Sequence, residues 1–352
     1  MRILHVIFCF PPDGAETMLV DIMNNQISSD DVDLLIINDV YNTELVKTIN
    51  EKVSVHLIRR KPGSKNPWKV LEMNYKILRV KPDVIHFHDH NAIGMALYKG
   101  HAKTLLTIHG MHRPARYLRS YDRLVSISAA VREDIISRVG CDSAVIYNGV
   151  DFSKIKSKSS IYRDGQFRIV QVGRLCHEIK GQHILLKALH EIVHKRGVKD
   201  VQLDFIGEGT SRGYLQGLVS DLNLQAHVKF LGLKDRQFIY ENLHTYSLLV
   251  QPSIHEGFGL TLLEAMGAKV PVLTASNPGP MEVISNGKFG YVFNNEDSEN
   301  CAVLLQKIYE QAKESTFACR IDAAYNYAIQ SFSIFQTVAK YCKVYKSLSP
   351  KS

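Results

Sequence analysis

The sequence predicts an α/β protein made of two successive halves, each a parallel sheet covered by helices. Three observations support this fold class. Short apolar runs alternate with helical patterns along the chain, as in strands joined by crossover helices. The length of 352 residues suits two domains. The pattern stops after Asn148-Gly149 and restarts at Phe167, which predicts a domain boundary between the halves.

The first half contains seven apolar runs typical of strands: Ile3–Phe8, Asp33–Ile37, Val53–Ile58, Asp83–Phe87, Thr104–Ile108, Arg123–Ser126 and Ala144–Ile146. Helical periodicity fills gaps between them at Ala15–Asn25, Pro67–Val80 and Ala129–Val139. The first run resembles a short signal peptide, but His5 interrupts it and Pro11-Pro12 follows. We therefore interpret it as a buried strand.

The second half repeats the pattern. Its predicted strands are Phe167–Val172, Val201–Ile206, His227–Phe230, Ser247–Val250 and Val270–Leu273. Its predicted helices are Gln182–Lys195, Arg212–Leu222, Leu260–Ala268, Ser298–Gln311, Thr316–Gln330 and Ser333–Ser347. These patterns give domains at residues 1–160 and 161–330, followed by a terminal helical segment at 331–352.

Composition excludes several classes of protein. The apolar fraction of 45% is too high for a disordered chain, and no run approaches 18 apolar residues, the length that spans a bilayer. The six cysteines are widely spaced and form no C-x-x-C pair. They predict reduced thiols and a cytoplasmic location.

The net charge of +8 is unevenly placed. Residues 59–81 contain eight basic residues and one acid, and residues 112–123 contain four arginines and one acid. Two basic islands in an otherwise acidic half indicate either an anionic surface or ligand at a defined place, or a solvated face.

The segment Glu256–Glu264 combines acids, glycines and a helix start. Open α/β sheets bind ligands at the carboxyl ends of their strands, so we expect a site between the two halves. Gly257 and Gly259 precede a helix whose first amides suit a pyrophosphate. Glu264 lies about one turn further on. The alternative is a plain glycine loop with Glu256 as a surface acid.

Two further loops offer ligand-binding groups. Arg174 and Lys180 follow a strand and would neutralise a diphosphate, or they are solvated cations. Gly14 lies at the first strand-to-helix turn, but the G-x-G-x-x-G fingerprint of nicotinamide dinucleotide sites is missing there. Gly207-Glu208-Gly209 imitates such a loop with the wrong spacing, and we interpret it as a tight turn.

Histidines mark two strand ends. His109 follows a buried strand and precedes a glycine, a position that fits either a structural or a catalytic residue. In His86-Phe87-His88-Asp89-His90, alternate side chains share one face and could ligate a metal. No distant Cys/His pair completes a recognisable zinc set, so we predict no metal.

In this order, the motifs resemble a family 4 glycosyltransferase of the GT-B fold. The resemblance rests on six segments: Gly14-Ala15-Glu16, Asp83–His88, Ile146–Asp151, the Arg174/Lys180 loop, Phe205–Gly209 and Glu256–Glu264. It implies two Rossmann-like domains facing an interdomain cleft. Residues 1–160 would bind the acceptor, 161–330 would bind the nucleotide-sugar donor, and the helix in 331–352 would cross back to the N-terminal domain.

The resemblance also implies roles for individual residues. Arg174 and Lys180 would hold the donor diphosphate, and Glu256 would meet the transferred sugar. The remaining implied contacts are a sugar pocket lined by Gly257, Phe258 and Gly259, backbone amides of Thr261 and Leu262 on phosphate, Glu264 on the ribose, Gly14 near donor and acceptor, and His109 facing the sugar. Two departures from the family pattern are Asp13, in place of a second glycine, and the six-residue step from Arg174 to Lys180.

The implied activity is transfer of a hexosyl group from a UDP- or GDP-sugar to a glycan or polyprenyl-linked acceptor. The resemblance implies retention of anomeric configuration without a metal, and we expect a place in capsular, exopolysaccharide or lipopolysaccharide biosynthesis. The basic islands then indicate a peripheral enzyme on the inner face of the cytoplasmic membrane rather than a nucleic-acid-binding protein. The alternatives are a nucleotide-sugar epimerase, a phosphorylase, or a non-catalytic nucleotide-sugar binding protein.

Overall fold

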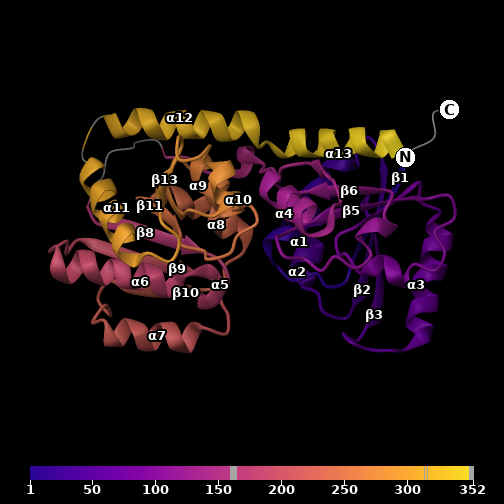
Figure 1. Ribbon diagram of the computed structural model, residues 1–352, viewed down its shortest axis with the longest axis horizontal. Helices are drawn as coiled ribbons and strands as arrows, with labels where there is room; N and C mark the ends of the chain where they lie inside the picture. Colours follow the sequence, from indigo (N-terminus) through magenta and orange to yellow (C-terminus); the bar gives the residue numbers. More distant parts are fainter. Residues whose placement is uncertain (159–164, 313, 315, 349–352) are drawn as a thin grey trace. The chain divides into compact units, whose positions relative to one another are not determined.

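The computed structural model describes residues 1–158, 165–312, 314 and 316–348 (Figure 1). The chain forms two compact units, Met1–Gly149 with Ile334–Ser352, and Val150–Ser333. The predicted boundary at 160/161 falls outside the described residues; the units divide earlier, at Gly149/Val150, because the segment after Val150 packs into the second unit. There the amide of Lys156 donates to the carbonyl of Tyr240 (3.0 Å). The second predicted boundary, at 330/331, lies three residues too early.

The first unit is built on a seven-stranded parallel sheet with strand order β3-β2-β1-β4-β5-β6-β7. The strands are β1 (Arg2–Ile7), β2 (Asp31–Asn38), β3 (Ser54–Arg60), β4 (Val84–Phe87), β5 (Lys103–Ile108), β6 (Arg123–Ser126) and β7 (Ala144–Val145). Its α-helices are α1 (Gly14–Gln26), α2 (Thr43–Lys47), α3 (Pro67–Val80), α4 (Ala129–Val139) and α13 (Ile334–Leu348), with 3₁₀ turns at Ala92–Met95 and Leu118–Ser120.

Local chemistry explains why two of these helices begin where the sequence predicts. Helix α3 starts at a proline, and the Asn66 side chain accepts from the amide of Trp68 (3.0 Å). Helix α4 starts after Ser128, whose hydroxyl accepts from Val131, and it ends at Gly140 in the left-handed conformation. Both helices match their predicted bounds.

The second unit has a six-stranded parallel sheet with order β10-β9-β8-β11-β12-β13. The strands are β8 (Phe167–Val172), β9 (Val201–Ile206), β10 (Val228–Gly232), β11 (Leu248–Gln251), β12 (Val272–Ala275) and β13 (Tyr291–Phe293). Its α-helices are α5 (His177–Lys180), α6 (Gln182–His190), α7 (Arg212–Asp221), α8 (Arg236–Asn242), α9 (Leu260–Gly267), α10 (Pro278–Val283), α11 (Ser298–Gln311) and α12 (Thr316–Ser331); 3₁₀ turns lie at Phe152–Lys154 and Leu243–Thr245.

The predicted helix Gln182–Lys195 is interrupted. Helix α6 ends at His190, and a π-helical turn follows over Glu191–Lys195, closed by the amide of Arg196 on the carbonyl of Glu191 (3.2 Å). Strand β13 and helices α5, α8 and α10 were not predicted, because each is much shorter than the window of about 11–18 residues over which the hydrophobic period is recognised.

The last two helices belong to different units. Helix α12 packs on α9 in the second unit, whereas α13 packs on α1 in the first. Tyr341 and Tyr345 of α13 are almost fully buried there. Across the described residues, none of the helices combines the length and the apolar character that a bilayer crossing requires. The six cysteines are free thiols.

Candidate functional site

In the second unit, loops at the carboxyl ends of β8 and β11 lie in direct contact. The amides of Ile254 and His255 both donate to the carbonyl of Ile179, at 2.8 and 3.2 Å. Gly181 has a φ of +65° and lies so close to β11 that a Cβ there would be 1.8 Å from the carbonyl oxygen of Pro252. Only glycine satisfies both conditions, and this contact brings the end of α5 against the Glu256 loop.

The loop after β9 packs on the other side of the β8 loop. The amide of Leu175 donates to the carbonyl of Glu208 (3.0 Å). A Cβ on Gly207 would lie 2.1 Å from the carbonyl oxygen of Gly173. The Gly207-Glu208-Gly209 segment is thus a close-packed turn beside the Arg174 loop, which fits the structural interpretation made from the sequence.

Lys180 and Glu256 form an ion pair in which Nζ lies 2.6 Å from Oε2. The Nε2 group of Gln251, the last residue of β11, also donates to this carboxylate oxygen (3.2 Å). Both charged side chains are largely but not fully buried, so a ligand can still reach them. The two residues that sequence analysis assigned to the diphosphate and to the sugar are therefore neighbours.

Arg174 lies exposed at the start of the same loop. Its carbonyl accepts from the side-chain amide of Gln182 (3.0 Å), and Gln171 donates to the carbonyl of Lys180 (3.1 Å). Two buried glutamines thus support the backbone on either side of the predicted cations. The six-residue step from Arg174 to Lys180 is accommodated by the single turn of α5 and by Gly181.

Helix α9 begins directly after the glycine segment. Gly259 caps it with a φ of +103°, and a Cβ on Gly279 would lie 2.4 Å from the carbonyl oxygen of Gly257. Phe258 is 2% exposed and packs on Phe332, so it belongs to the core rather than to an open pocket wall. Its role in lining the sugar pocket stays a prediction.

The predicted phosphate donors at the start of α9 differ in their availability. The amide of Leu262 already donates to the carbonyl of Gly259 (3.1 Å), and the Leu262 side chain is fully buried. Thr261 and Glu264 are half-buried on this helix. Thr261 lies in the first turn, where amides lack an acceptor within the helix, and its role on phosphate stays a prediction.

Several buried polar atoms around these loops have no hydrogen-bond partner among the described residues: Gln171 Oε1, Gln182 Oε1, Gln251 Oε1 and Ser253 Oγ. An unsatisfied buried polar atom costs roughly 1–3 kcal/mol, and such atoms are rare in folded proteins. Their concentration at one sheet edge is what we expect where a polar ligand binds.

The first unit places its predicted residues at the carboxyl edge of its own sheet. Gly14 begins α1 after β1, and His109 follows β5 directly. His109 Nε2 is hydrogen-bonded to His88 Nδ1 (3.1 Å), whereas its Nδ1 is buried without a partner in the described structure. Burial and the nearby Arg113 lower the pKa of His109 to about 4, so its ring is neutral at pH 7.

His5, His86 and His88 form the cluster expected from alternate positions of a strand, with ligand atoms within 4.8 Å of one another. Their nitrogens are engaged in hydrogen bonds: His5 Nδ1 with His88 Nε2 (3.0 Å), and His86 Nε2 with Thr107 Oγ1 (2.7 Å). The three imidazole rings are buried, and the cluster contains no carboxylate. Burying a divalent cation without an anionic ligand is costly, so this donor set suits a hydrogen-bond network better than a metal.

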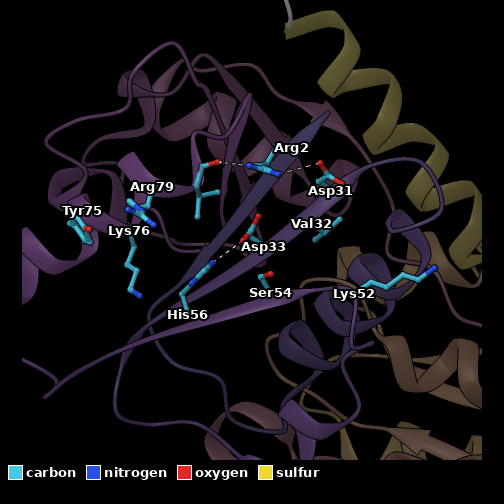
Figure 2. A pocket seen from close by; sticks show the side chains of 11 residues that line it. Arg2, Asp31, Val32, Asp33, Lys52, Ser54, His56, Tyr75, Lys76 and Arg79 are labelled. Atoms are coloured by element: carbon cyan, nitrogen blue, oxygen red, sulfur yellow. Dashed lines mark hydrogen bonds and ion pairs between the residues drawn. The ribbon is translucent and has the colours of Figure 1, made fainter.

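A cavity of about 660 Å³ lies at the opposite edge of this sheet (Figure 2). It opens at the first residues of β1, β2 and β3, where Arg2 pairs with Asp31 (3.5 Å) and His56 with Asp33 (2.8 Å). Tyr75, Lys76 and Arg79 of α3 form its other wall. Because α/β sheets bind substrates at their carboxyl ends, this cavity is not the candidate active site.

Two family matches cover most of the chain. Residues 12–154 match Glycosyltransferase Family 4, and residues 152–319 match Glycosyl transferases group 1. The chain is built from two glycosyltransferase family domains. The matches confirm the resemblance at the level of glycosyltransferase group 1 and family 4 domains.

Curated relatives include sugar-transferring enzymes, and solved structures confirm the predicted fold class of two parallel-sheet Rossmann-like domains, the GT-B fold. A glycogen synthase of Mycobacterium tuberculosis is 28% identical over 255 residues, which cover 65% of this chain and 61% of that enzyme. A phosphatidyl-myo-inositol mannosyltransferase of the same organism is 24% identical over 292 residues, covering 76% and 74%. Anabaena HepE, crystallised with UDP and glucose, superposes with a TM-score of 0.84 at 22% identity, covering 99% and 100%. Because the match covers only 61% of the glycogen synthase, this chain spans less than two thirds of that relative's length.

Sequence analysis missed the residues that support the site. Gln251, Gln171 and Gln182 carry no motif of their own, and their partners become visible only when the loops are folded. Gly279 was missed for the same reason. The only available signal was position, because Gln251 ends a buried strand at the active edge of the sheet.

Proposed function

We propose that this glycosyltransferase moves a hexosyl group from a nucleotide-diphosphate sugar to a glycan or polyprenyl-linked acceptor, with retention of anomeric configuration. The observation that carries the proposal is the Lys180–Glu256 pair beside the start of α9. A cation, a carboxylate and free helix amides in one place suit a sugar joined to a diphosphate. The binding of UDP and UDP-glucose by HepE crystals makes UDP-sugars the first donors to test.

The proposed reaction breaks the bond between the anomeric carbon and the β-phosphate oxygen. Negative charge grows on that oxygen as the bond lengthens. Lys180, Arg174 and the Thr261 amide would bind this charge more strongly than the ground state, and Glu264 would bind the ribose. These groups supply the required charge by themselves, so we propose a metal-independent reaction.

Retention would follow from a front-face route. In that route the departing phosphate accepts the proton of the acceptor hydroxyl, and the new bond forms on the face from which the phosphate leaves. Glu256 would then bind hydroxyls of the transferred sugar instead of acting as a nucleophile, consistent with its existing bonds to Lys180 and Gln251. We propose that Gly14 and His109, at the carboxyl edge of the first unit's sheet, contribute substrate contacts from that unit.

The decisive experiment compares Glu256→Gln with wild type in a mass-spectrometric screen of UDP- and GDP-sugars for transfer and slow hydrolysis. We expect turnover to fall by at least about 100-fold, because a charged contact to the reacting sugar is lost. Affinity for the nucleotide alone should change little. Glu178→Gln, an exposed acid of α5, is the matched control. Equal turnover of wild type and Glu256→Gln would refute the site.

The same screen separates the alternative functions. An epimerase converts the donor without an acceptor, and a phosphorylase requires free phosphate. A non-catalytic binding protein would bind a nucleotide-sugar but neither transfer nor hydrolyse it.

We further propose that the enzyme works peripherally on the inner face of the cytoplasmic membrane, in capsular, exopolysaccharide or lipopolysaccharide synthesis. Helix α3 exposes four large apolar side chains at spacings of three, four and three residues: Trp68, Leu71, Tyr75 and Leu78. Trp68 is 75% exposed. Lys69, Lys76 and Arg79 lie beside this stripe, an arrangement typical of helices that lie on anionic membranes.

Two relations support the membrane proposal. The mannosyltransferase relative is named for a lipid acceptor. The cavity of Figure 2 adjoins the stripe through Tyr75 and adds Lys52, Lys76 and Arg79 to the same basic region. Among the described residues, none of these three cations forms an ion pair, so each can face lipid phosphates.

Sedimentation with vesicles of anionic phospholipid at low salt tests this proposal. The double variant Trp68→Ser with Leu71→Ser should lower the bound fraction at least tenfold, since burying each side chain contributes roughly 1.5–3 kcal/mol. The control is Leu233→Ser with Val303→Ser, two exposed apolar residues of the second unit. Wild-type protein that stays in the supernatant would contradict membrane association without affecting the transferase assignment.

A further inference from the structure

A continuous chain of hydrogen bonds runs through the core of the first unit and ends at His109. Gln26 Oε1 contacts His5 Nε2 at 2.9 Å, and His5 Nδ1 contacts His88 Nε2 at 3.0 Å. His88 Nδ1 then contacts His109 Nε2 at 3.1 Å. The residues come from the end of α1, the middle of β1 and the ends of β4 and β5. Two rings, those of His5 and His88, therefore link His109 to a glutamine on a helix.

The three rings are neutral at pH 7. Burial lowers the pKa of His5 to about 4 and holds the pKa of His88 well below 6.5. A neutral imidazole has one N–H donor and one bare nitrogen. A ring that donates a hydrogen bond from one nitrogen must therefore accept at the other, so the donor–acceptor direction is the same along all three rings. One anchoring group at the end is enough to set all three tautomers.

Gln26 provides that anchor, because its side-chain oxygen can only accept. His5 must donate from Nε2, which leaves His5 Nδ1 bare to accept from His88 Nε2–H. His88 Nδ1 is then bare and accepts from His109 Nε2–H. The result is a bare Nδ1 on His109, the atom that is buried without a partner.

The other end of Gln26 is fixed by a second branch. Its Nε2 donates to the Tyr345 hydroxyl (3.1 Å), and that hydroxyl contacts His86 Nδ1 at 2.8 Å. His86 Nε2 contacts Thr107 Oγ1 at 2.7 Å. Tyr345 belongs to α13, so the terminal helix places its hydroxyl against the amide nitrogen of Gln26.

We infer that Gln26 is a positioning residue, which acts through His5 and His88 to hold His109 in the Nε2–H tautomer, with Nδ1 free to accept a hydrogen bond from a hydroxyl of the sugar substrate. This inference rests on the proposed function for the identity of the hydroxyl, but not for the tautomer. A buried nitrogen without a partner costs stability, and a substrate hydroxyl would satisfy it.

The tautomer is measurable without substrate. In ¹⁵N-histidine-labelled wild-type protein at pH 7, long-range ¹H–¹⁵N correlation spectra should show a bare Nδ1 and a protonated Nε2 for His5, His88 and His109, assigned by single substitutions. A protonated Nδ1 on His109 would overturn the inference. This outcome is independent of whether the protein transfers sugar.

Substitution tests the role of Gln26 itself. Methionine in place of Gln26 offers no strong acceptor to His5. The hydrogen bonds among His5, His88 and His109 can then run in either donor–acceptor direction with the same number of ring nitrogens unpartnered, so His109 should populate both tautomers. Turnover should then fall in proportion to the lost tautomer, about twofold when the two are equally populated. Thr107→Val, which cuts only the His86 branch, should keep the Nε2–H signature. A single unchanged tautomer in Gln26→Met would refute the positioning role.

The link to the reaction has a separate readout. His109→Ala should lower turnover of the transferase with little effect on nucleotide affinity. If the tautomer is as inferred but His109→Ala turns over at the wild-type rate, the bond to the sugar is refuted and the tautomer assignment stands. If wild type shows no transfer with any donor, only the proposed function fails.

Discussion

At the residue scale, the Lys180–Glu256 pair shows how a weak sequence signal becomes a site. Each residue alone was compatible with a solvated surface charge. The 2.6 Å contact arises because Gly181 lets the β8 loop touch the β11 loop. Sequence spacing predicted both charged residues, but not the glutamine that holds Glu256, since a glutamine has no preferred partner until the backbone is folded.

Gln251→Leu provides the residue-scale prediction. The substitution removes a hydrogen bond to a carboxylate, which contributes roughly 1.5–3 kcal/mol, so we expect kcat to fall about tenfold or more. The Michaelis constant for the donor should change less, because the diphosphate contacts remain. The control for steady-state kinetics is Gln202→Leu, because this glutamine of β9 has the same exposed fraction of 7% as Gln251. Equal losses in the two variants would mean that Gln251 acts only through stability.

At the element scale, bounds were predicted best where the chain supplies its own start and stop. Helices α3 and α4 have side-chain caps and left-handed residues at their ends, and both matched residue for residue. Strand β13 and the π-helical turn after His190 were missed. A three-residue strand is defined by its neighbour in the sheet, and a π turn by packing, and neither leaves a periodic signal.

Gly181→Ala tests how tightly the two site loops are packed. The new Cβ would meet the Pro252 carbonyl at 1.8 Å, in a residue whose φ is already +65°. We expect a loss of about 3–4 kcal/mol in the free energy of unfolding of the second unit, measured by urea denaturation. Gly197→Ala has a φ of +72° with no atom within 4 Å of the new Cβ, so it isolates the backbone cost of about 1 kcal/mol. Similar losses in both variants would contradict the close approach.

At the scale of the whole molecule, composition and alternation predicted two α/β units, but not where the chain passes between them. The crossing lies at Gly149/Val150 because Val150 donates to Phe332 (2.8 Å) and the following residues pack in the second unit. The first pattern ends at Asn148-Gly149, next to that position, but the second restarts only at Phe167, so the sequence confined the boundary to the gap between them. The histidine chain was equally hidden, because its members come from four separate segments.

The buried histidines predict a pH dependence of stability. Unfolding restores the ordinary pKa of 6.5 to His5, whose folded pKa is about 4. Between these values the unfolded chain binds the extra proton, so stability is complete above pH 6.5 and is lost as the pH falls towards 4. For His5 alone the loss is ~3 kcal/mol.

Thermal unfolding at steps between pH 7.5 and pH 4.5 measures this loss. His5→Gln should make the pH profile shallower without abolishing it, because burial also lowers the pKa values of His88 and His109, whereas His101→Gln, at an exposed position, should leave it unchanged. A wild-type unfolding temperature that is constant across this range would contradict neutral buried rings.

The measurement that tests the central claim most directly is calorimetric titration of UDP, and of GDP in parallel, into wild type and Lys180→Met. If Lys180 exchanges its ion pair with Glu256 for a contact with the donor diphosphate, the variant should bind the preferred nucleotide at least about tenfold more weakly, because one charged hydrogen bond is lost. Lys187→Met, an exposed lysine of α6, should bind as wild type does. Identical affinities for wild type and Lys180→Met would show that the diphosphate is held elsewhere, and the proposed donor site would be wrong.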